Sequence, residues 1–265
     1  MCGIVGYLGE KDSLDIILNG LKRLEYRGYD SAGIAVYNGS TIACCKSKGK
    51  ISKLEKSLSK RKNLKGGLGI GHTRWATHGE PNNINAHPQF SNSNKLCLVH
   101  NGIIENYSTI KQKLVKEGFT FKSETDTEVL VNLIEYVKTK ENVKLGEAVQ
   151  IALNQVIGAY AIAVIDNDKP DEIVVAKLGS PLCIGVGDDE YFIGSDVTPF
   201  IEYTKNVVYL EDGELAIIRN HKETFYRKIV DDKLVSPTVS KLELSLDKIE
   251  KQGFDHYMLK EIYEQ

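Results

Sequence analysis

The stretch that decides the fold opens the chain and reads Met1-Cys2-Gly3-Ile4-Val5-Gly6. Removal of Met1 is permitted before a small side chain, and it would leave Cys2 with both a thiol and a free α-amine. An α-amine has an ordinary pKa of about 7.7 to 8.0, so near neutral pH it can accept the thiol proton. The apolar run 4–8 predicts a strand that would hold this nucleophile inside a sheet. The alternative is a small buried cysteine at the start of a strand.

The composition excludes several classes of protein. The chain has 265 residues, of which 42% are hydrophobic, and a formal net charge of -2. We expect a soluble globular chain with no dedicated nucleic-acid surface and no membrane segment. The N-terminus lacks the basic and apolar regions of a signal peptide. Five cysteines without a C-x-x-C pair predict neither a disulfide framework nor a zinc site, and reduced thiols in the cytoplasm fit best.

The predicted strands fall into two batches on either side of a group of helices. Asn38-Gly39 separates two apolar runs and predicts a hairpin with a primed turn. The predicted strands are 4–8, 32–37, 41–46, 68–73 and 96–100, and then 160–165, 172–177, 182–186, 191–194, 207–210, 214–219 and 224–227. This segregation favours an α+β fold with antiparallel sheets covered by helices.

Helical periodicity marks four segments within the first 155 residues. The predicted helices are 13–23, 106–117, 126–139 and 145–155. Thr125-Asp126-Thr127-Glu128 is a capping box with an acid in the first turn of the third helix. The pattern weakens after Val230, and the charged, helical segment 242–265 is typical of a linker. We therefore expect one domain over residues 1–240 and a linker over residues 241–265.

The segment 71–81 concentrates functional side chains at the end of a predicted strand, which is where rigid scaffolds present sites. Arg74 is suited to bind a carboxylate through its bidentate fork, with added hydrogen bonds from Thr77 and His78. The alternative for Arg74 is a solvated ion pair. Trp75, the only tryptophan, lies in the same segment.

Two other patterns in the sequence do not support a cofactor. His72, His78, His87 and His100 lack the helical pairing and the nearby acid of a zinc motif, so we expect no metal. The glycine-rich stretch 67–71 leads into a strand, whereas a dinucleotide-binding loop opens a helix. It predicts a tight turn into a strand.

Asn101-Gly102 and Asp126 complete the set of candidate site residues. A side-chain amide and an unhindered backbone N–H at adjacent positions can form an oxyanion hole, although the same pair often makes an ordinary turn. Asp126 either favours the dipole of its helix or faces a substrate ammonium group.

Together these pieces resemble the class II glutamine amidotransferase domain of the N-terminal nucleophile group. Five segments carry the resemblance, in the order in which the family has them. They are Cys2-Gly3-Ile4-Val5-Gly6, Arg27-Gly28-Tyr29-Asp30-Ser31-Ala32-Gly33, His72-Thr73-Arg74-Trp75-Ala76-Thr77-His78-Gly79, His100-Asn101-Gly102-Ile103-Ile104-Glu105-Asn106 and Ser123-Glu124-Thr125-Asp126-Thr127-Glu128. The resemblance implies a four-layer αββα sandwich with two antiparallel sheets between helix layers.

The resemblance also implies a role for each site residue. Cys2 would attack the side-chain amide of L-glutamine, with its own α-amine as base, and the products would be glutamate and ammonia. Asn101 and Gly102 would hold the oxyanion. Arg74, Thr77 and His78 would bind the α-carboxylate of the substrate, and Asp126 would bind its α-ammonium. Arg27 would order the chain near the nucleophile, and Trp75 would gate the passage of ammonia. No cofactor is implied.

Within this family two segments resemble the aminotransferases that convert fructose 6-phosphate to glucosamine 6-phosphate. They are Leu24-Glu25-Tyr26-Arg27-Gly28-Tyr29-Asp30 and His256-Tyr257-Met258-Leu259-Lys260-Glu261-Ile262-Tyr263-Glu264-Gln265. In those enzymes the tail leads into two sugar isomerase (synthase) domains, and the full-length chain is expected to be a homo-oligomer. This chain is similar to their glutaminase half.

Two other interpretations stay open at the level of sequence. One is an amidase of the same fold that serves another substrate or acceptor. The other is a non-catalytic binding module, which retention of Met1 would favour because an amide-bound Cys2 nitrogen cannot act as a base.

Overall fold

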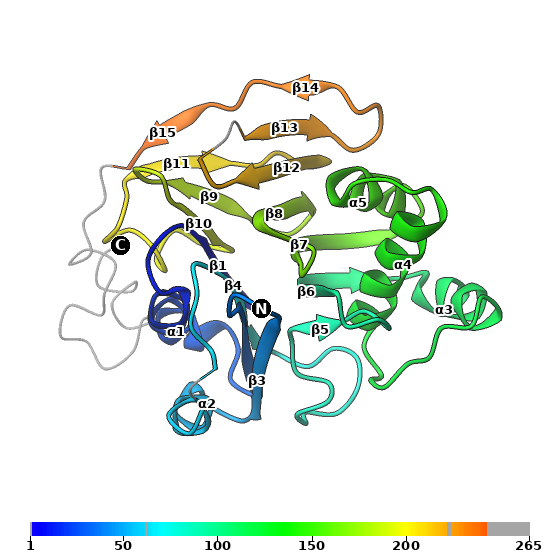
Figure 1. The fold of residues 1–265 in the computed structure, drawn as a ribbon, viewed down its shortest axis with the longest axis horizontal. Coiled ribbons are helices and arrows are strands. Elements are labelled where there is room, and N and C mark those ends of the chain that lie inside the picture. Colours follow the sequence, from blue (N-terminus) through cyan, green and yellow to red (C-terminus); the bar gives the residue numbers. More distant parts are fainter. Residues whose placement is uncertain (1, 62, 222–223, 243–265) are drawn as a thin grey trace, which may run out of the picture.

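The computed structural model describes residues 2–61, 63–221 and 224–242, and their strands form two antiparallel sheets (Figure 1). The first sheet has eight strands in the order β15-β11-β9-β10-β1-β4-β2-β3. In chain order its strands are β1 (Gly3–Leu8), β2 (Ser31–Tyr37), β3 (Ile42–Lys48), β4 (Leu68–Arg74), β9 (Cys183–Val186), β10 (Tyr191–Gly194), β11 (Asn206–Tyr209) and β15 (Val239–Lys241).

The second sheet has seven strands in the order β14-β13-β12-β8-β7-β6-β5. Its strands are β5 (Gln89–Phe90), β6 (Leu96–Ile104), β7 (Gly158–Asp166), β8 (Lys169–Leu178), β12 (Glu214–Arg219), β13 (Phe225–Lys228) and β14 (Leu234–Val235). Both sheets therefore combine strands from the two batches that the sequence predicts on either side of the helices.

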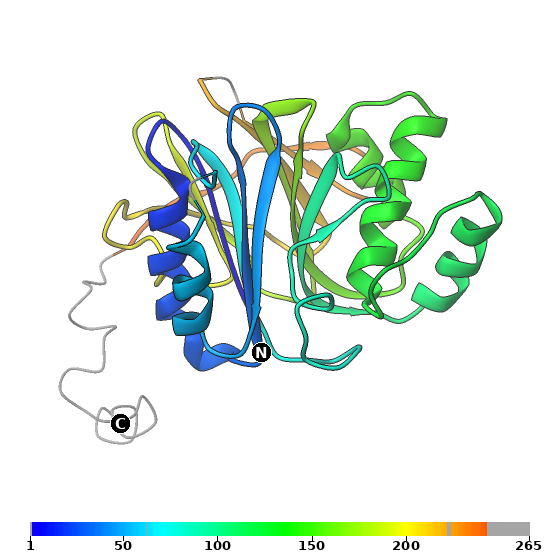
Figure 2. The same cartoon turned by 60° about the horizontal axis from the view of Figure 1, so that its bottom comes forward.

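Helices cover the outer face of each sheet, so the molecule has four layers (Figure 2). On the first sheet lie α1 (Ser13–Arg23) and α2 (Ile51–Leu58), with the 3-10 helix η1 (Glu25–Arg27) after α1. On the second sheet lie α4 (Asp126–Lys140) and α5 (Leu145–Leu153), and α3 (Tyr107–Lys116) packs against α4. This arrangement confirms the predicted αββα sandwich.

Three layers of apolar packing hold the sandwich together. Between the two sheets, side chains such as Ile4, Ile70 and Val99 are fully buried. A second cluster packs α1 and α2 on the first sheet, and a third packs α3, α4 and α5 on the second sheet. Burial of this kind contributes about 25 cal/mol per Å² of apolar surface and is the main favourable term in folding.

Two helix starts show how local sequence sets the element boundaries. The Asp12 side chain accepts a hydrogen bond from the Leu14 N–H and begins α1 at the predicted residue. Thr125 likewise accepts from the Glu128 N–H and begins α4. The carboxylate of Glu128, however, binds the N–H groups of Lys122 and Ser123, so the predicted capping box is only half formed.

β1 lies in the middle of the first sheet, between β10 and β4, and all six of its residues are buried. Gly3 pairs with Thr73 and Ile4 with His72. The Gly3 N–H also donates to the Thr73 hydroxyl at 3.1 Å, and the Ile4 N–H to the Ser195 hydroxyl at 3.1 Å. Cys2 is thus fixed next to a central strand, as the sequence predicts.

The structure corrects several predicted boundaries. The strand predicted over 96–100 continues to Ile104, so Asn101 and Gly102 lie within β6 and do not form a turn. The hairpin loop has four residues, and Asn38 accepts from the Ser40 and Thr41 N–H groups in place of the predicted two-residue primed turn.

Short elements escaped the sequence prediction because they span few turns or few residues. These are α2, η1, β5, β14 and β15. β15 adds an edge strand to the first sheet and ends at Lys241, beside the predicted domain boundary. The predicted linker helix lies, from residue 243 onward, outside the described residues.

Candidate functional site

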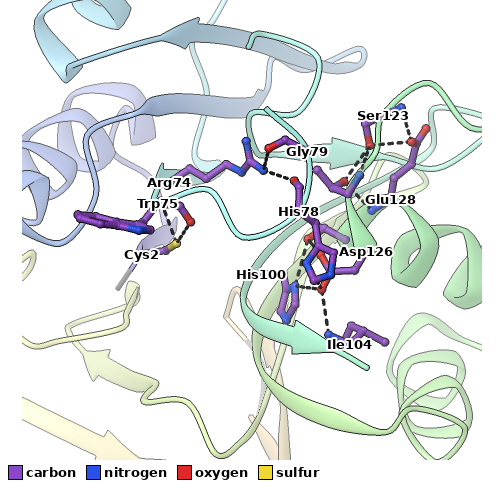
Figure 3. Close-up of polar contacts among 12 residues, drawn as sticks. Cys2, Arg74, Trp75, His78, Gly79, His100, Ile104, Ser123, Asp126 and Glu128 are labelled. Carbon is purple, nitrogen blue, oxygen red and sulfur yellow. Dashed lines mark hydrogen bonds and ion pairs between the residues drawn. The ribbon is translucent and has the colours of Figure 1, made fainter. Parts of the chain in front are cut away.

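All nine predicted site residues line one cavity of about 250 Å³. The first sheet and its loops contribute the predicted residues on one side, and β6 and the start of α4 contribute those on the other. The nine residues are Cys2, Arg27, Arg74, Trp75, Thr77, His78, Asn101, Gly102 and Asp126. We call the part around Cys2, Trp75, Asn101 and Gly102 the nucleophile end, and the part around Arg74, His78 and Asp126 the charged end. Figure 3 shows Cys2 and Trp75 at the first and His78 and Asp126 at the second.

Cys2 is held by backbone groups of the loop that follows β4. The Trp75 N–H donates to Cys2 Sγ at 3.1 Å, and the thiol faces the Trp75 carbonyl oxygen at 3.4 Å. Burial raises the pKa of the Cys2 thiol above its ordinary value, and the hydrogen bond from Trp75 opposes this shift. The site therefore favours the protonated thiol, and the sulfur needs a base before it can attack.

Asn101 joins the two sheets at the nucleophile. Its Nδ2 donates to the Cys2 carbonyl oxygen at 3.0 Å, and its Oδ1 lies 2.9 Å from Nε2 of His72 in β4. The side chain is 7% exposed. An amide nitrogen carries two hydrogens, so one remains for a ligand in the cavity.

Gly102 has a backbone conformation that requires glycine. Its φ is +126°, and a Cβ built on it would lie 2.0 Å from the Ala159 carbonyl oxygen. No L side chain fits this position without a shift of β7. The absence of a side chain also leaves the Gly102 backbone open toward the cavity, which it lines.

Arg74 ends β4 with its guanidinium buried at the charged end (Figure 3). Its Nη2 donates to the carbonyl oxygens of His78 and, at 3.1 Å, of Gly79. Its Nη1 is buried and has no hydrogen-bond partner among the described residues. Because a buried donor without a partner is costly, this atom is suited to an anionic ligand.

Asp126 is the first residue of α4 and its side chain is 5% exposed. One carboxylate oxygen accepts from the Ile104 N–H at 2.9 Å, and the same oxygen lies 4.0 Å from Nδ1 of both His78 and His100. Burial lowers the pKa of His100, which favours the neutral ring, and the nearby Asp126 opposes this shift. The buried carboxylate of Asp126 suits a cationic ligand group.

The remaining predicted residues frame the cavity. Arg27 Nη1 donates to the Ser195 carbonyl oxygen at 3.2 Å and lies 3.6 Å from Asp196, and Ser195 in turn binds Ile4 of β1. Trp75 is 48% exposed and meets Tyr29 edge to face. Thr77 is exposed at the rim.

Sequence reasoning missed several residues that line the cavity. His87 and His100 entered only as candidates for metal binding, and both are buried in the wall. Thr125 and Thr127 flank Asp126, so the capping sequence at the start of α4 was a signal that could have pointed to them. Ser180 and Pro181 follow β8, far along the chain, and no motif in the sequence marks them.

Neither a metal centre nor a membrane-spanning helix is found among the described residues. They contain no group of three or more histidine, cysteine or acidic side chains placed to hold a metal ion. None of their helices has both the length and the apolar character needed to span a membrane.

Comparison with known proteins matches the whole chain to relatives in one family. The family described as "Glutamine amidotransferase domain" matches residues 59–255. Glutamine–fructose-6-phosphate aminotransferase [isomerizing] of Bacteroides thetaiotaomicron is 56% identical over all of this chain and 43% of its own length. The protein of the same name from Chlorobaculum tepidum is 52% identical, again over all of this chain and 43% of its own length. The chain thus spans less than half the length of these relatives.

A solved structure extends the likeness to three dimensions. Glutamine phosphoribosylpyrophosphate amidotransferase from B. subtilis superposes with a TM-score of 0.73 and 31% sequence identity, over 87% of this chain and 50% of that one. Sequence, fold and the cavity at Cys2 agree with the resemblance drawn from the five motifs. The chain belongs to the glutamine amidotransferase domain family.

Proposed function

We propose that the cavity hydrolyses the side-chain amide of L-glutamine to glutamate and ammonia. One observation carries the proposal: a thiol lies at one end of the cavity, and Arg74 and Asp126, of opposite charge, lie at the other (Figure 3). Glutamine has an amide at one end of its side chain and both an α-carboxylate and an α-ammonium at the other. An amide substrate without both charges would leave Arg74 or Asp126 buried and unpaired, at a cost in binding energy.

The reaction begins with proton transfer from the Cys2 thiol. Because burial raises the thiol pKa, a base is needed, and the α-amine of Cys2 becomes available once Met1 is removed. Sγ then bonds to the amide carbon, and the negative charge moves to the amide oxygen. The protonated α-amine gives its proton to the departing nitrogen, which leaves as ammonia. Water then hydrolyses the thioester and releases glutamate.

The negative charge of the tetrahedral intermediate needs donors that are already in place. Asn101 Nδ2 is fixed beside Cys2 by its bond to the Cys2 carbonyl oxygen. The Gly102 backbone adjoins it in β6, and its N–H is the second donor in the proposed oxyanion hole. Loss of one such donor typically costs about 10² to 10³ in kcat.

The α-carboxylate of glutamine would pair with Arg74 Nη1, the buried donor without a partner among the described residues. Thr77 and His78 would add hydrogen bonds from the rim. The α-ammonium would pair with Asp126. Arg27 would order the nucleophile end through Ser195.

In the longer protein, we propose, the ammonia converts fructose 6-phosphate to glucosamine 6-phosphate. The names of the relatives support this reaction, and this chain covers 43% of their length, which leaves room for sugar isomerase domains. Trp75, exposed at the nucleophile end, would gate the passage of ammonia to those domains. A homo-oligomer is proposed for the full-length enzyme, and the cytoplasm for its location.

The test measures glutamate release from glutamine by chain whose Met1 removal has been verified by mass spectrometry. We expect turnover by the processed chain and its loss, by at least about 10⁴-fold, in Cys2→Ala. The matched control is Cys44→Ala, which removes another partly exposed thiol away from the cavity and should leave turnover unchanged. Equal hydrolysis by the processed chain and Cys2→Ala would refute the proposal.

A further inference from the structure

His72 lies next to the nucleophile end without lining the cavity. It belongs to β4 in the first sheet, pairs with Ile4 of β1 and is fully buried. Its Nε2 lies 2.9 Å from Oδ1 of Asn101, which belongs to β6 in the second sheet. This side-chain hydrogen bond therefore crosses from one sheet to the other beside Cys2.

The Cys2 carbonyl oxygen, which contacts the Asn101 amide, determines which ring nitrogen of His72 carries the hydrogen. The Cys2 carbonyl oxygen can only accept, so the amide group that faces it at 3.0 Å must be the NH₂. The amide oxygen then faces His72. An oxygen also only accepts, so His72 Nε2 must donate, and the neutral ring must carry its hydrogen on Nε2.

The surroundings of His72 agree with this tautomer. Its Nδ1 is buried and has no hydrogen-bond partner among the described residues. The neighbouring ring of His87 lies with its centroid 4.3 Å away, at 35° to the His72 ring. Burial lowers the pKa of His72 to about 3, although the Asn101 side chain and, more weakly, the nearby His100 backbone oppose the shift, so the ring is neutral at physiological pH.

The opposite tautomer would disturb the site. With hydrogen on Nδ1, the bare Nε2 would face the Asn101 oxygen, and two acceptors would repel each other at this distance. Rotation of the amide by 180° would relieve that contact, but it would turn the amide oxygen toward the Cys2 carbonyl. Asn101 would then have no N–H directed at the nucleophile end.

We propose that His72 is a positioning residue that, as the Nε2–H tautomer, fixes the Asn101 amide with its NH₂ toward Cys2 and the oxyanion. This inference rests on the proposed function and names a residue that acts only through Asn101. We expect the effect on rate to be about the size of the loss of one oxyanion donor.

The tautomer can be measured on the unmodified chain by ¹⁵N NMR of the histidine rings, so this arm needs no substitution. We expect His72 to give a protonated Nε2 and a bare Nδ1 from about pH 6 to about pH 8, with no titration in that range. A hydrogen on Nδ1, or a charged ring at neutral pH, would overturn the proposal.

Two amide substitutions test the position of the donor. Gln is long enough to place an N–H near the site of Nε2, whereas Asn is shorter and cannot reach Asn101. We expect His72→Asn to lower kcat for glutamine hydrolysis about 10²-fold with KM nearly unchanged, and His72→Gln to stay within about tenfold of the parent chain. Equal kcat values for the two variants would overturn the proposal.

A double-mutant cycle separates positioning from general damage. If His72 acts only through Asn101, His72→Asn changes kcat less than about threefold when Asn101→Ala is already present. An equal loss in both backgrounds would show a structural role and overturn the proposal.

Alkylation of Cys2 by iodoacetamide, followed by peptide mass spectrometry, is a further readout. It makes no oxyanion, so its rate should be the same in His72→Asn and the parent chain.

The two proposals fail in different ways. If the processed chain releases no glutamate, the proposed function is wrong, while the NMR measurement still decides the tautomer. If Cys2→Ala is inactive but His72→Asn retains full kcat, the proposed function stands and the role of His72 is refuted.

Discussion

The two ends of the cavity differ in the charge of the groups that line them. At the nucleophile end the partners of Cys2 are uncharged: the Trp75 backbone holds the sulfur, and the Asn101 amide holds the carbonyl oxygen. At the charged end Arg74 and Asp126 carry full charges, and Arg74 Nη1 has no partner among the described residues. The thiol must be held in place beside its base, and uncharged hydrogen-bonding groups are sufficient for this. Recognition of an amino acid, in contrast, requires one positive and one negative side chain that can pair with the ligand.

The largest expected effect concerns the base at the nucleophile end. Chain purified from cells whose methionine aminopeptidase is inhibited should keep Met1, so the Cys2 nitrogen is an amide that cannot accept a proton. We expect kcat about 10² to 10⁴-fold lower than that of the processed chain. Glutamate release by the two preparations checks this, with the fraction of chain that keeps Met1 quantified in each by mass spectrometry. Equal rates would assign the base to another group.

The backbone of the nucleophile end should tolerate little change at Gly102. Gly102→Ala must keep a φ of +126° and place Cβ 2.0 Å from the Ala159 carbonyl oxygen. We expect the free energy of unfolding to fall by about 3 kcal/mol or more. The matched control is Gly118→Ala, with φ +89° and nothing within 4 Å, which should cost only about 1 to 2 kcal/mol. Urea unfolding measures both, and equal losses would contradict the clash.

At the charged end, Asp126→Asn keeps the shape of the side chain and removes its charge. We expect kcat/KM for glutamine to fall about 10 to 100-fold, because a charged hydrogen bond to the ammonium is lost. 4-Carbamoylbutanoate, which is glutamine without the ammonium, provides the control substrate. The parent chain should prefer glutamine strongly, and Asp126→Asn should lose most of that preference. An unchanged preference would place the ammonium elsewhere.

The smallest expected effect, over the measured range of about pH 6.5 to about pH 5, concerns the stability of the folded chain as pH falls. Burial lowers the pKa of His72 to about 3 in the folded chain, whereas an unfolded histidine titrates near 6.5. Below about pH 6.5 the unfolded chain therefore binds more protons, and the free energy of unfolding decreases as pH falls. This one ring should contribute about 1.4 kcal/mol per pH unit down toward pH 3.

Urea unfolding between about pH 6.5 and about pH 5 measures this slope before most carboxylates titrate. In His72→Gln the unfolded chain should bind about one proton fewer, since the variant has no ring to protonate. The slope of the free energy of unfolding against pH should therefore be shallower. His87 and His100, whose pKa values burial also lowers, should supply the slope that remains. An unchanged slope in His72→Gln would show that His72 is protonated in the folded chain.

Much of the fold was predictable because its elements are long and periodic. The helix Ser13–Arg23 was predicted with its observed bounds, since its apolar residues recur at helical spacing. Short elements such as β14 and β15 were not predictable, because two or three residues carry no period. The boundary of β6 was also missed: Asn101-Gly102 has the local signature of a turn, but pairing with β7 keeps both residues in the strand.

The sequence by itself determined which candidate groups this protein has: a thiol at position 2, an arginine, an aspartate and an Asn-Gly pair, all in motifs of one family. Only the tertiary structure decided which of these groups meet, and in which orientation. His72 shows the difference, because its bond to Asn101 joins β4 of one sheet to β6 of the other, and only folding brings these two strands together. A local pattern records residue types, whereas the direction of a donor depends on partners that only folding brings together.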